Sequence, residues 1–299
     1  MYVIFFTKKY AYKKLFSRIQ DILSGFKDFL IVKFQNSAHK RKKGGTGMST
    51  VIETRDLCKT YIVNKQSNNV LQNVNFKVEE GEFVTVMGPS GSGKSTLLYT
   101  VSGMDNVTAG SVFFDGDEIS AMKDKQLVNL RLLKMGFVFQ QMYMMKKLSI
   151  IDNIILPGFQ AKIRPREEIR KDAEELMRKL GIIDEADREI TEVSGGQLQR
   201  ACLCRALINH PKVIFADEPT GALNSKASNE VMERLIEANR MGTTILMVTH
   251  SEKVASISDR IIYLMDGNIQ GELILGKKTD DDLSKRERKV REWLGEMGW

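Results

Sequence analysis

Short apolar runs alternate with amphipathic, helix-like segments along most of the chain, beginning near residue 50. Four runs near the start of this region are rich in aliphatic, aromatic or β-branched side chains, as is typical of β-strands: residues 51–57, 74–78, 83–87 and 111–114. Three later runs are almost continuously apolar: residues 213–216, 244–249 and 261–264. Because such runs are expected for strands buried on both faces, the pattern predicts an α/β fold.

Helix and turn signals lie between these runs. A helix is predicted from Lys94, and a second one opens at Pro165, since proline fits the first turn of a helix. Gly181 ends the second helix. Its apolar face is formed by Ile169, Ala173, Leu176, Met177 and Leu180. The dipeptides Glu80-Gly81 and Asp115-Gly116 predict tight turns, the second of them within a hairpin.

Charge divides the 299 residues unevenly. The whole chain carries a formal net charge of +7, but residues 1–47 hold 11 Lys and Arg against 2 Asp, which leaves the remainder slightly acidic. A nearly neutral main body argues against a nucleic-acid-binding surface. No run approaches the roughly 18 consecutive apolar residues that a membrane-spanning helix needs, so any transport function requires a membrane partner.

Residues 1–47 form a segment of their own. Apolar side chains recur there at helical spacing between lysines and arginines, which is typical of a basic amphipathic helix on an anionic membrane surface. The alternative is translated upstream sequence, with the start at Met48. We favour this alternative, because Lys43-Gly44-Gly45 can be encoded by a purine run that resembles a bacterial ribosome-binding site. The main domain is then expected at 48–276, followed by a charged tail at 277–299 with a short apolar end.

The three cysteines, Cys58, Cys202 and Cys204, are odd in number and lack the spacing of a zinc site or a disulfide framework. Cysteine without such spacing usually behaves as a small apolar side chain. We therefore expect buried or half-buried free thiols in a reducing compartment.

The strongest chemical signal is the stretch GPSGSGKST, called the phosphate loop here, which matches GxxxxGK[ST] between a strand and a helix. Glycines let backbone N–H groups turn toward phosphate oxygens, and the helix N-terminus favours the same negative charge. Lys94 can neutralise the β- and γ-phosphates, and the Ser95 hydroxyl can bind Mg²⁺. The predicted nucleotide-binding residues are Gly88, Pro89, Ser90, Gly91, Ser92, Gly93, Lys94, Ser95 and Thr96.

Two carboxylates, Asp217 and Glu218, follow the apolar run at 213–216. Carboxylates at the end of a buried strand are costly unless they are paired. Mg²⁺ is the natural partner of Asp217, which leaves Glu218 to polarise the attacking water. His250 ends another apolar strand, at the edge where α/β sheets gather ligands.

These residues together resemble the ABC-type ATPases. Residues 194–200 read SGGQLQR and resemble the signature motif of that family, in its usual place before the strand that ends in Asp217. The resemblance covers roughly residues 50–275. It implies a P-loop NTPase core with a mixed, largely parallel sheet, an antiparallel β subdomain and an inserted α-helical subdomain at about 141–205.

The resemblance also implies roles for single residues. Gln140 matches the glutamine that joins Ser95 and Asp217 at the Mg²⁺ and assists catalysis, His250 matches the switch histidine at the γ-phosphate, and Tyr61 matches the aromatic that stacks on adenine. Ser194, Gly195, Gly196 and Gln197 would close over ATP held by a second copy of the chain.

Two positions depart from the family pattern. Val193 replaces the common leucine before the signature motif, an apolar exchange that should be tolerated. Asn224 replaces the usual aspartate of the D-loop and loses its charge, which makes coupling between two ATP sites less certain than ATP binding. The asparagine could equally serve as the N-cap of a following helix.

The function implied is that of an ATP-binding subunit of an ABC transporter, which binds ATP and Mg²⁺ as a head-to-tail homodimer and drives a multi-spanning permease from the cytoplasmic face of a bacterial membrane. The wording GFVFQQ and DEPTGAL is similar to the branch for lipoprotein release, macrolide export and bacitracin-type resistance. Export or antimicrobial-peptide resistance is therefore expected, with a sensor kinase acting through the permease in the bacitracin-type case.

Alternatives remain at three points. The cluster Met142-Tyr143-Met144-Met145 suits either an adaptable permease-binding groove or ordinary core packing. A soluble ABC ATPase acting on DNA or the ribosome is disfavoured, because such proteins commonly carry two cassettes or a long coiled-coil insertion. A GTP-binding switch is disfavoured because the signature motif has no role there.

Overall fold

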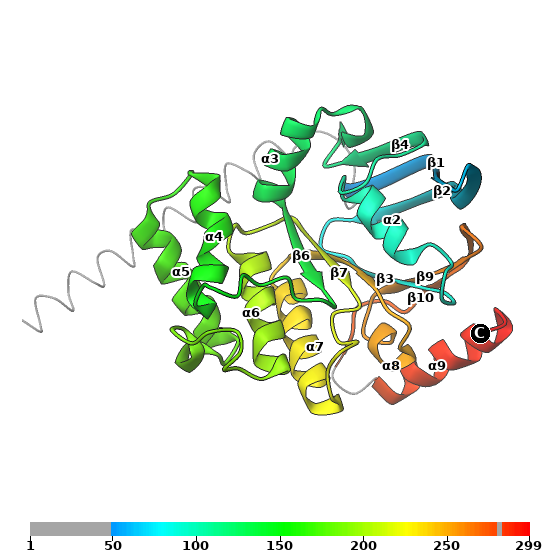
Figure 1. Cartoon of the computed structure of the whole chain (residues 1–299). Coiled ribbons are helices and arrows are strands. Elements are labelled where there is room, and N and C mark those ends of the chain that lie inside the picture. Colours follow the sequence, from blue (N-terminus) through cyan, green and yellow to red (C-terminus); the bar gives the residue numbers. More distant parts are fainter. Residues whose placement is uncertain (1–48, 280–282) are drawn as a thin grey trace, which may run out of the picture. The chain divides into compact units, whose positions relative to one another are not determined.

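The computed structural model describes residues 49–279 and 283–299 (Figure 1). The basic segment at 1–47 lies outside the described residues, and both hypotheses about it stay open. Two sheets form the framework, a four-stranded sheet in the order β2-β1-β4-β5 and a six-stranded sheet in the order β10-β9-β3-β8-β7-β6. The expected α/β fold with a mixed sheet and an antiparallel sheet is confirmed.

The four-stranded sheet is antiparallel throughout. Its strands are β1 (Thr50–Val63), β2 (Gln66–Glu79), β4 (Ala109–Phe114) and β5 (Asp117–Glu118). Asn64 and Lys65 join β1 to β2, both with positive φ, as a two-residue hairpin turn requires. The hairpin predicted at Asp115-Gly116 is confirmed between β4 and β5. The sequence predicted only the inner parts of β1 and β2, which hold most of their buried residues; the outer ends of both strands are largely exposed.

The six-stranded sheet is parallel except for β10, which pairs antiparallel with β9 at one edge. Its strands are β3 (Phe83–Met87), β6 (Met135–Phe139), β7 (Val213–Asp217), β8 (Thr244–Val248), β9 (Arg260–Met265) and β10 (Asn268–Ile274). The strands predicted at 83–87, 213–216, 244–249 and 261–264 are confirmed as β3, β7, β8 and β9 within one or two residues.

Helices connect and cover the strands (Figure 1). They are α2 (Lys94–Val101), α3 (Asp124–Lys134), α4 (Ile150–Ala161), α5 (Arg166–Lys179), α6 (Gly195–Leu207), α7 (Ser225–Arg240), α8 (Glu252–Ala255) and α9 (Leu283–Glu296), with short 3₁₀ turns at Ile119–Ala121 and Ile183–Glu185. The helices predicted from Lys94 and at Pro165 are confirmed, Pro165 being the N-cap of α5. Helices α4 to α6 fall in the predicted helical subdomain, whose limits stay a prediction. None of the helices in the described ranges is long and apolar enough to cross a bilayer.

Alternating residues of the parallel strands face two different cores. In β7, Val213 and Phe215 pack with the antiparallel sheet and α2, whereas Ile214 and Ala216 pack with α4 to α7. Both sides of the strand are therefore apolar, which explains its continuous apolar run. Because β3, β7 and β8 run parallel, the polar residues that follow these strands gather at one edge of the sheet.

The cysteines are free thiols. Cys202 and Cys204 are buried on α6, and Cys58 is half-buried on β1. Burial raises the pKa of the Cys202 thiol to about 11 and that of Cys204 further. The prediction of free, buried or half-buried thiols is confirmed.

Candidate functional site

The phosphate loop joins β3 to the first turn of α2. Gly88 and Gly93 both have positive φ, and a Cβ atom at either position would collide with backbone, 1.9 Å from the Leu264 carbonyl oxygen and 2.8 Å from that of Val70. Only glycine fits at such positions. The Ser92 hydroxyl is buried and has no hydrogen-bond partner within the described part of the chain. An orphaned donor inside a glycine cradle at a helix N-terminus fits an anionic group such as a phosphate.

Lys94 lies folded against this loop. Its Nζ donates to the carbonyl oxygens of Gly88 at 2.8 Å and of Pro89 at 2.7 Å, and the side chain is largely buried. Burial lowers the pKa of Lys94, whereas the nearby charges of Glu218 and Asp217 act in the opposite direction. The ammonium group is thus held at the phosphate loop, close to both carboxylates.

Asp217 accepts two hydroxyl hydrogen bonds. The Ser95 Oγ donates to its Oδ1 at 2.9 Å, and the Tyr99 hydroxyl donates to its Oδ2 at 2.6 Å. A buried carboxylate needs such partners. The oxygens of Ser95 and Asp217 are of the kind that Mg²⁺ prefers, so the predicted metal-holding pair fits that ion.

Tyr99 was not predicted from the sequence. Its burial, together with its hydrogen bond to Asp217, raises the pKa of its hydroxyl far above the usual range. The signal in the sequence was its position four residues after Ser95 on the same helix, which places both hydroxyls on one face. Tyr99 therefore belongs with the residues that surround Asp217.

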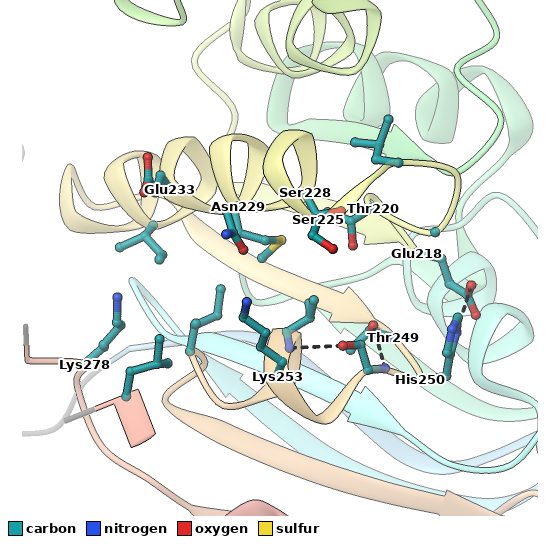
Figure 2. Close-up of a pocket in the computed structure, with 18 residues that line it drawn as sticks. Glu218, Thr220, Ser225, Ser228, Asn229, Glu233, Thr249, His250, Lys253 and Lys278 are labelled. Carbon is teal, nitrogen blue, oxygen red and sulfur yellow. Dashed lines mark hydrogen bonds and ion pairs between the residues drawn. The ribbon is translucent and has the colours of Figure 1, made fainter. Parts of the chain in front are cut away.

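Glu218 and His250 lie side by side after neighbouring strands. The His250 Nδ1 and the Glu218 Oε2 are 3.1 Å apart, and Figure 2 shows the two side chains pointing toward one another. Glu218 has a φ of 45°, and its amide donates to the Val248 carbonyl oxygen at 3.0 Å. A non-glycine residue held in this conformation is uncommon outside special sites. The backbone thus fixes the direction of this carboxylate.

Gln140 follows β6 and lies beside Glu218. A Cβ atom on Gly221 would be 2.8 Å from the Gln140 Nε2 and 3.3 Å from the Glu218 Oε2. The missing side chain at Gly221 therefore leaves room for both groups. The structure brings Gln140 and Glu218 to the same glycine, although their separation in the sequence is large, and the predicted place of Gln140 at the Mg²⁺ stays a prediction.

Two cavities meet at Glu218 and His250. One, of about 380 Å³, is lined by the phosphate loop, Val70, these two residues and Trp299. The other, of about 430 Å³, extends from Glu218 and His250 between α7 and α8 (Figure 2). The first cavity holds the residues expected to bind phosphate, and the second lies next to it.

Tyr61 does not line the phosphate-loop cavity. Its hydroxyl donates to the Asp105 Oδ2 at 2.5 Å, and the Lys59 ammonium lies 4.7 Å from the centre of its ring. The side chain is about one third exposed. Its stacking on adenine stays a prediction, since the ring already has a cationic partner in this arrangement.

The signature segment, residues 194–200, forms the start of α6. The Ser194 Oγ accepts from the Gln197 amide at 3.3 Å, and the Gln197 Oε1 accepts from the Ser194 amide at 2.8 Å, which is a capping box. The Gln197 Nε2 also donates to Glu185 at 2.6 Å. The first turn of α6 is therefore rigidly placed, with its Gly195 and Gly196 amides at the helix N-terminus.

This segment is separate from the phosphate loop. Ser194, Gly196 and Gln197 line a cavity of about 280 Å³ that shares no residue with the phosphate-loop cavity. Figure 1 shows α2 and α6 in different parts of the molecule. Asn224 lines the same small cavity and caps α7, accepting from the Ala227 amide at 2.9 Å, as predicted. One copy of the chain does not bring its two phosphate-binding segments together.

Comparison with known proteins agrees with this geometry. The profile of the family described as ABC transporter matches residues 71–221. The uncharacterized ABC transporter ATP-binding protein YknY of Bacillus subtilis is 40% identical over 219 residues, covering 73% of this chain and 95% of that protein. The chain belongs to the ABC transporter family. It is an ABC-type ATPase and an ATP-binding subunit of a transporter.

Other members of the family are similar over the same region. The bacitracin export ATP-binding protein BceA of Halalkalibacterium halodurans is 38% identical over 246 residues, covering 82% of this chain and 97% of that protein. Macrolide export and lipoprotein-releasing ATP-binding proteins also match, so the predicted resemblance to this branch is confirmed. A dimeric structure of the ATP-binding cassette MJ0796 bound to ADP and Pi covers 76% of this chain and all of that one, with 38% identity and a TM-score of 0.71.

Replacing Tyr99 with phenylalanine should raise the Mg²⁺ concentration needed for half-maximal ATP hydrolysis about ten- to a hundredfold, because one hydrogen bond to a charged partner is worth about 1.5–3 kcal/mol. The ring keeps its packing beside Phe139. Hydrolysis measured against Mg²⁺ at saturating ATP checks this. Tyr143→Phe is the control, because Tyr143 is exposed and its ring also contacts Phe139. An unchanged Mg²⁺ requirement in the Tyr99 variant would show that the bond does not orient Asp217.

Proposed function

We propose that this cassette hydrolyses MgATP at two composite sites of a head-to-tail homodimer and thereby drives a membrane permease. The observation that carries the proposal is the separation of the phosphate-loop cavity from the signature cavity within one chain. Each cavity offers backbone donors at a helix N-terminus, a feature that suits phosphate, yet neither encloses a triphosphate alone. The dimeric state of the similar cassette MJ0796 supports a site completed by a second copy.

Within such a site the roles follow from the contacts. Lys94 neutralises the β- and γ-phosphates. Ser95, Asp217 and Gln140 would hold the Mg²⁺, which would supply positive charge against the phosphate oxygens. Glu218 orients and polarises the attacking water. His250 lies within hydrogen-bonding distance of Glu218 and contacts the γ-phosphate.

The signature segment of the second copy closes the site. Ser194, Gly195, Gly196 and Gln197 present the α6 N-terminus to the γ-phosphate, where the capping box has already fixed their backbone. ATP then joins the two copies, and hydrolysis lets them separate. Asn224 keeps a hydrogen-bonding side chain at the D-loop, but that side chain is engaged as the N-cap of α7. Coupling between the two ATP sites is therefore proposed to depend on contacts other than this side chain.

The permease is proposed to bind near the segment after Gln140. Arg205 fixes this segment by donating to the carbonyl oxygens of Met142 at 2.9 Å and Tyr143 at 2.8 Å. Met144 packs against the core, whereas Tyr143 and Met145 are exposed. Core packing therefore applies to Met144, whereas the exposed pair offers an adaptable apolar contact for the proposed permease.

The class of transported molecule is inferred from the relatives that the chain resembles. Relatives named for bacitracin, macrolide and lipoprotein systems support export or antimicrobial-peptide resistance, with the cassette on the cytoplasmic face of the cell membrane. A sensor kinase acting through the permease is part of the bacitracin-type alternative. Co-purification of the full chain with a multi-spanning permease separates this proposal from a soluble ABC ATPase.

Complementation between two inactive variants tests the composite site. Lys94→Ala leaves the signature segment intact, and Ser194→Arg leaves the phosphate loop intact. Each alone should be inactive, whereas an equimolar mixture should recover up to about one quarter of the parent rate, because half of the dimers hold one complete site. Phosphate release from the separate and mixed proteins is the measurement.

The matched control mixes Lys94→Ala with the double variant Lys94→Ala/Ser194→Arg, in which no pairing creates a complete site. A mixture of the single variants that releases no more phosphate than the two proteins separately would contradict the head-to-tail arrangement. Circular dichroism of each variant shows whether both remain folded.

A further inference from the structure

Helix α9 brings an aromatic side chain to the phosphate-loop cavity. Trp299, three residues beyond the end of α9, lines this cavity together with Lys94, Glu218 and His250. The other lining residues are Val70, His250, the charged Lys94 and Glu218, and small residues of the phosphate loop. Trp299 is therefore the one large aromatic surface in this cavity among the described residues, and it comes from a part of the chain beyond the matched family profile.

The position of Trp299 is fixed by its neighbours. Its ring meets the ring of Tyr263 edge-on, with the centres 6.2 Å apart, and its amide donates to the Leu294 carbonyl oxygen at 3.0 Å. Tyr263 is buried and pairs in register with Met87, the residue directly before the phosphate loop. The indole is thus held by the strand next to the one that carries the loop.

The beginning of α9 is anchored as firmly as its end. The Arg286 guanidinium is buried and donates to the carbonyl oxygens of Ser256 at 2.7 Å and Ser258 at 2.6 Å. Val290 and Leu294 are fully buried against β9. A buried guanidinium with several acceptors is a demanding interaction that defines one position of the helix. Helix α9 therefore presents Trp299 in a defined place rather than as a loose end.

We propose that Trp299 is a contact residue for the bound nucleotide and forms one wall of its site. The proposal rests on the proposed function, since it needs the phosphate loop to bind a nucleoside triphosphate. An indole supplies a large rigid surface and one N–H donor. The surface excludes water from the bound ligand, and the N–H can donate a hydrogen bond to an anionic group. The residue would supply an aromatic contact in addition to the one predicted for Tyr61.

The second tryptophan of the chain is a matched control. Trp293 also meets Tyr263 edge-on at 6.2 Å, but it packs on Gly271 and does not line the cavity. The chain has two tryptophans in all. Trp293→Phe therefore leaves Trp299 as the single indole. Trp299→Phe leaves Trp293, which lies on α9 and contacts the same tyrosine.

The test is a fluorescence titration of both full-length variants with MgATP, with calorimetry as an independent measure of binding. The emission of Trp299 should change as ATP saturates the site, and that of Trp293 should not. Trp299→Ala should weaken ATP binding about five- to tenfold, Trp299→Phe less, and Trp293→Phe less than twofold. The titration is repeated with Ser194→Arg added, which blocks closure of two copies, so that a contact with nucleotide is separated from a contact with the partner.

Each result decides the matter. An emission change of Trp299 that persists with Ser194→Arg, joined by the loss of affinity in Trp299→Ala, supports the contact. Silent Trp299 emission while calorimetry shows ATP binding would overturn the inference and leave the proposed function intact. A change that disappears with Ser194→Arg would also overturn it, since the indole then senses the second copy. Calorimetry without any ATP binding by the parent chain would instead refute the proposed function.

Discussion

Replacing Glu218 with glutamine should abolish ATP turnover while ATP remains bound and holds two copies of the chain together. We expect the hydrolysis rate to fall about 10²- to 10⁴-fold, the range that a positioned general base contributes. Glutamine has the same length and can still accept a hydrogen bond from His250, 3.1 Å from the carboxylate in the parent structure. What it loses is the ability to take a proton from water.

The backbone of Glu218 makes this a clean test. Two backbone hydrogen bonds hold its left-handed conformation. The Glu218 amide donates to the Val248 carbonyl oxygen, and the Gly221 amide donates to the Glu218 carbonyl oxygen at 3.0 Å. Neither bond involves the side chain, so the exchange leaves the path of the chain and the phosphate loop unchanged. The measurements are phosphate release and molecular mass in solution with MgATP, with light scattering after size exclusion.

Glu233→Gln is the matched control for this experiment. Glu233 lies on α7 and lines the neighbouring cavity, away from the phosphate loop. This variant should hydrolyse ATP at the parent rate. A Glu218→Gln protein that kept normal turnover, or that stayed monomeric with MgATP bound, would contradict the assignment of the base or the composite site respectively.

Replacing Lys94 with alanine should reduce the affinity for ATP by roughly 10²-fold or more. Hydrogen bonds to charged groups are worth about 1.5–3 kcal/mol each, and Lys94 is expected to serve two phosphates. Its ammonium group is already held at the loop by the Gly88 and Pro89 carbonyl oxygens. Among the described residues no other lysine and no arginine lines this cavity, so little can compensate.

Calorimetric titration with ATP measures this effect, and thermal unfolding shows whether the variant remains folded. Lys77→Ala, an exposed lysine on β2, is the control and should bind ATP as the parent does. A Lys94→Ala protein with an ATP affinity within threefold of the parent would show that another group neutralises the phosphates.

Much of the site could be predicted because its chemistry is local in sequence. Glycines, lysine and serine of the phosphate loop act on one turn and one helix start, so a contiguous stretch identifies them. The same holds for Ser194 with Gln197, whose capping box spans four residues. The cap formed by Asn224 on α7 is equally local, and so both could be proposed before any packing was known.

Several of the missed elements have a weak or divided pattern. The outer ends of β1 and β2 are exposed on both faces, so they lack the period of two that marks a half-buried strand. Strand β10 is largely exposed at the edge of its sheet. In α9 the spacing of Val290, Trp293, Leu294 and Met297 was a helical signal, but the surrounding charge gave the segment the character of a solvated tail.

The sequence by itself determined which residues are the candidates for phosphate chemistry and that the strands beneath them are buried on both faces, because short-range geometry and continuous apolar runs leave few alternatives. Only the tertiary structure decided which distant side chains meet: the Tyr99 hydroxyl on Asp217, Gln140 beside Glu218, and Trp299 in the phosphate-loop cavity. Those contacts depend on how strands order themselves in a sheet and where α9 docks, and the free energy of that packing is shared among many side chains that lie far apart along the chain.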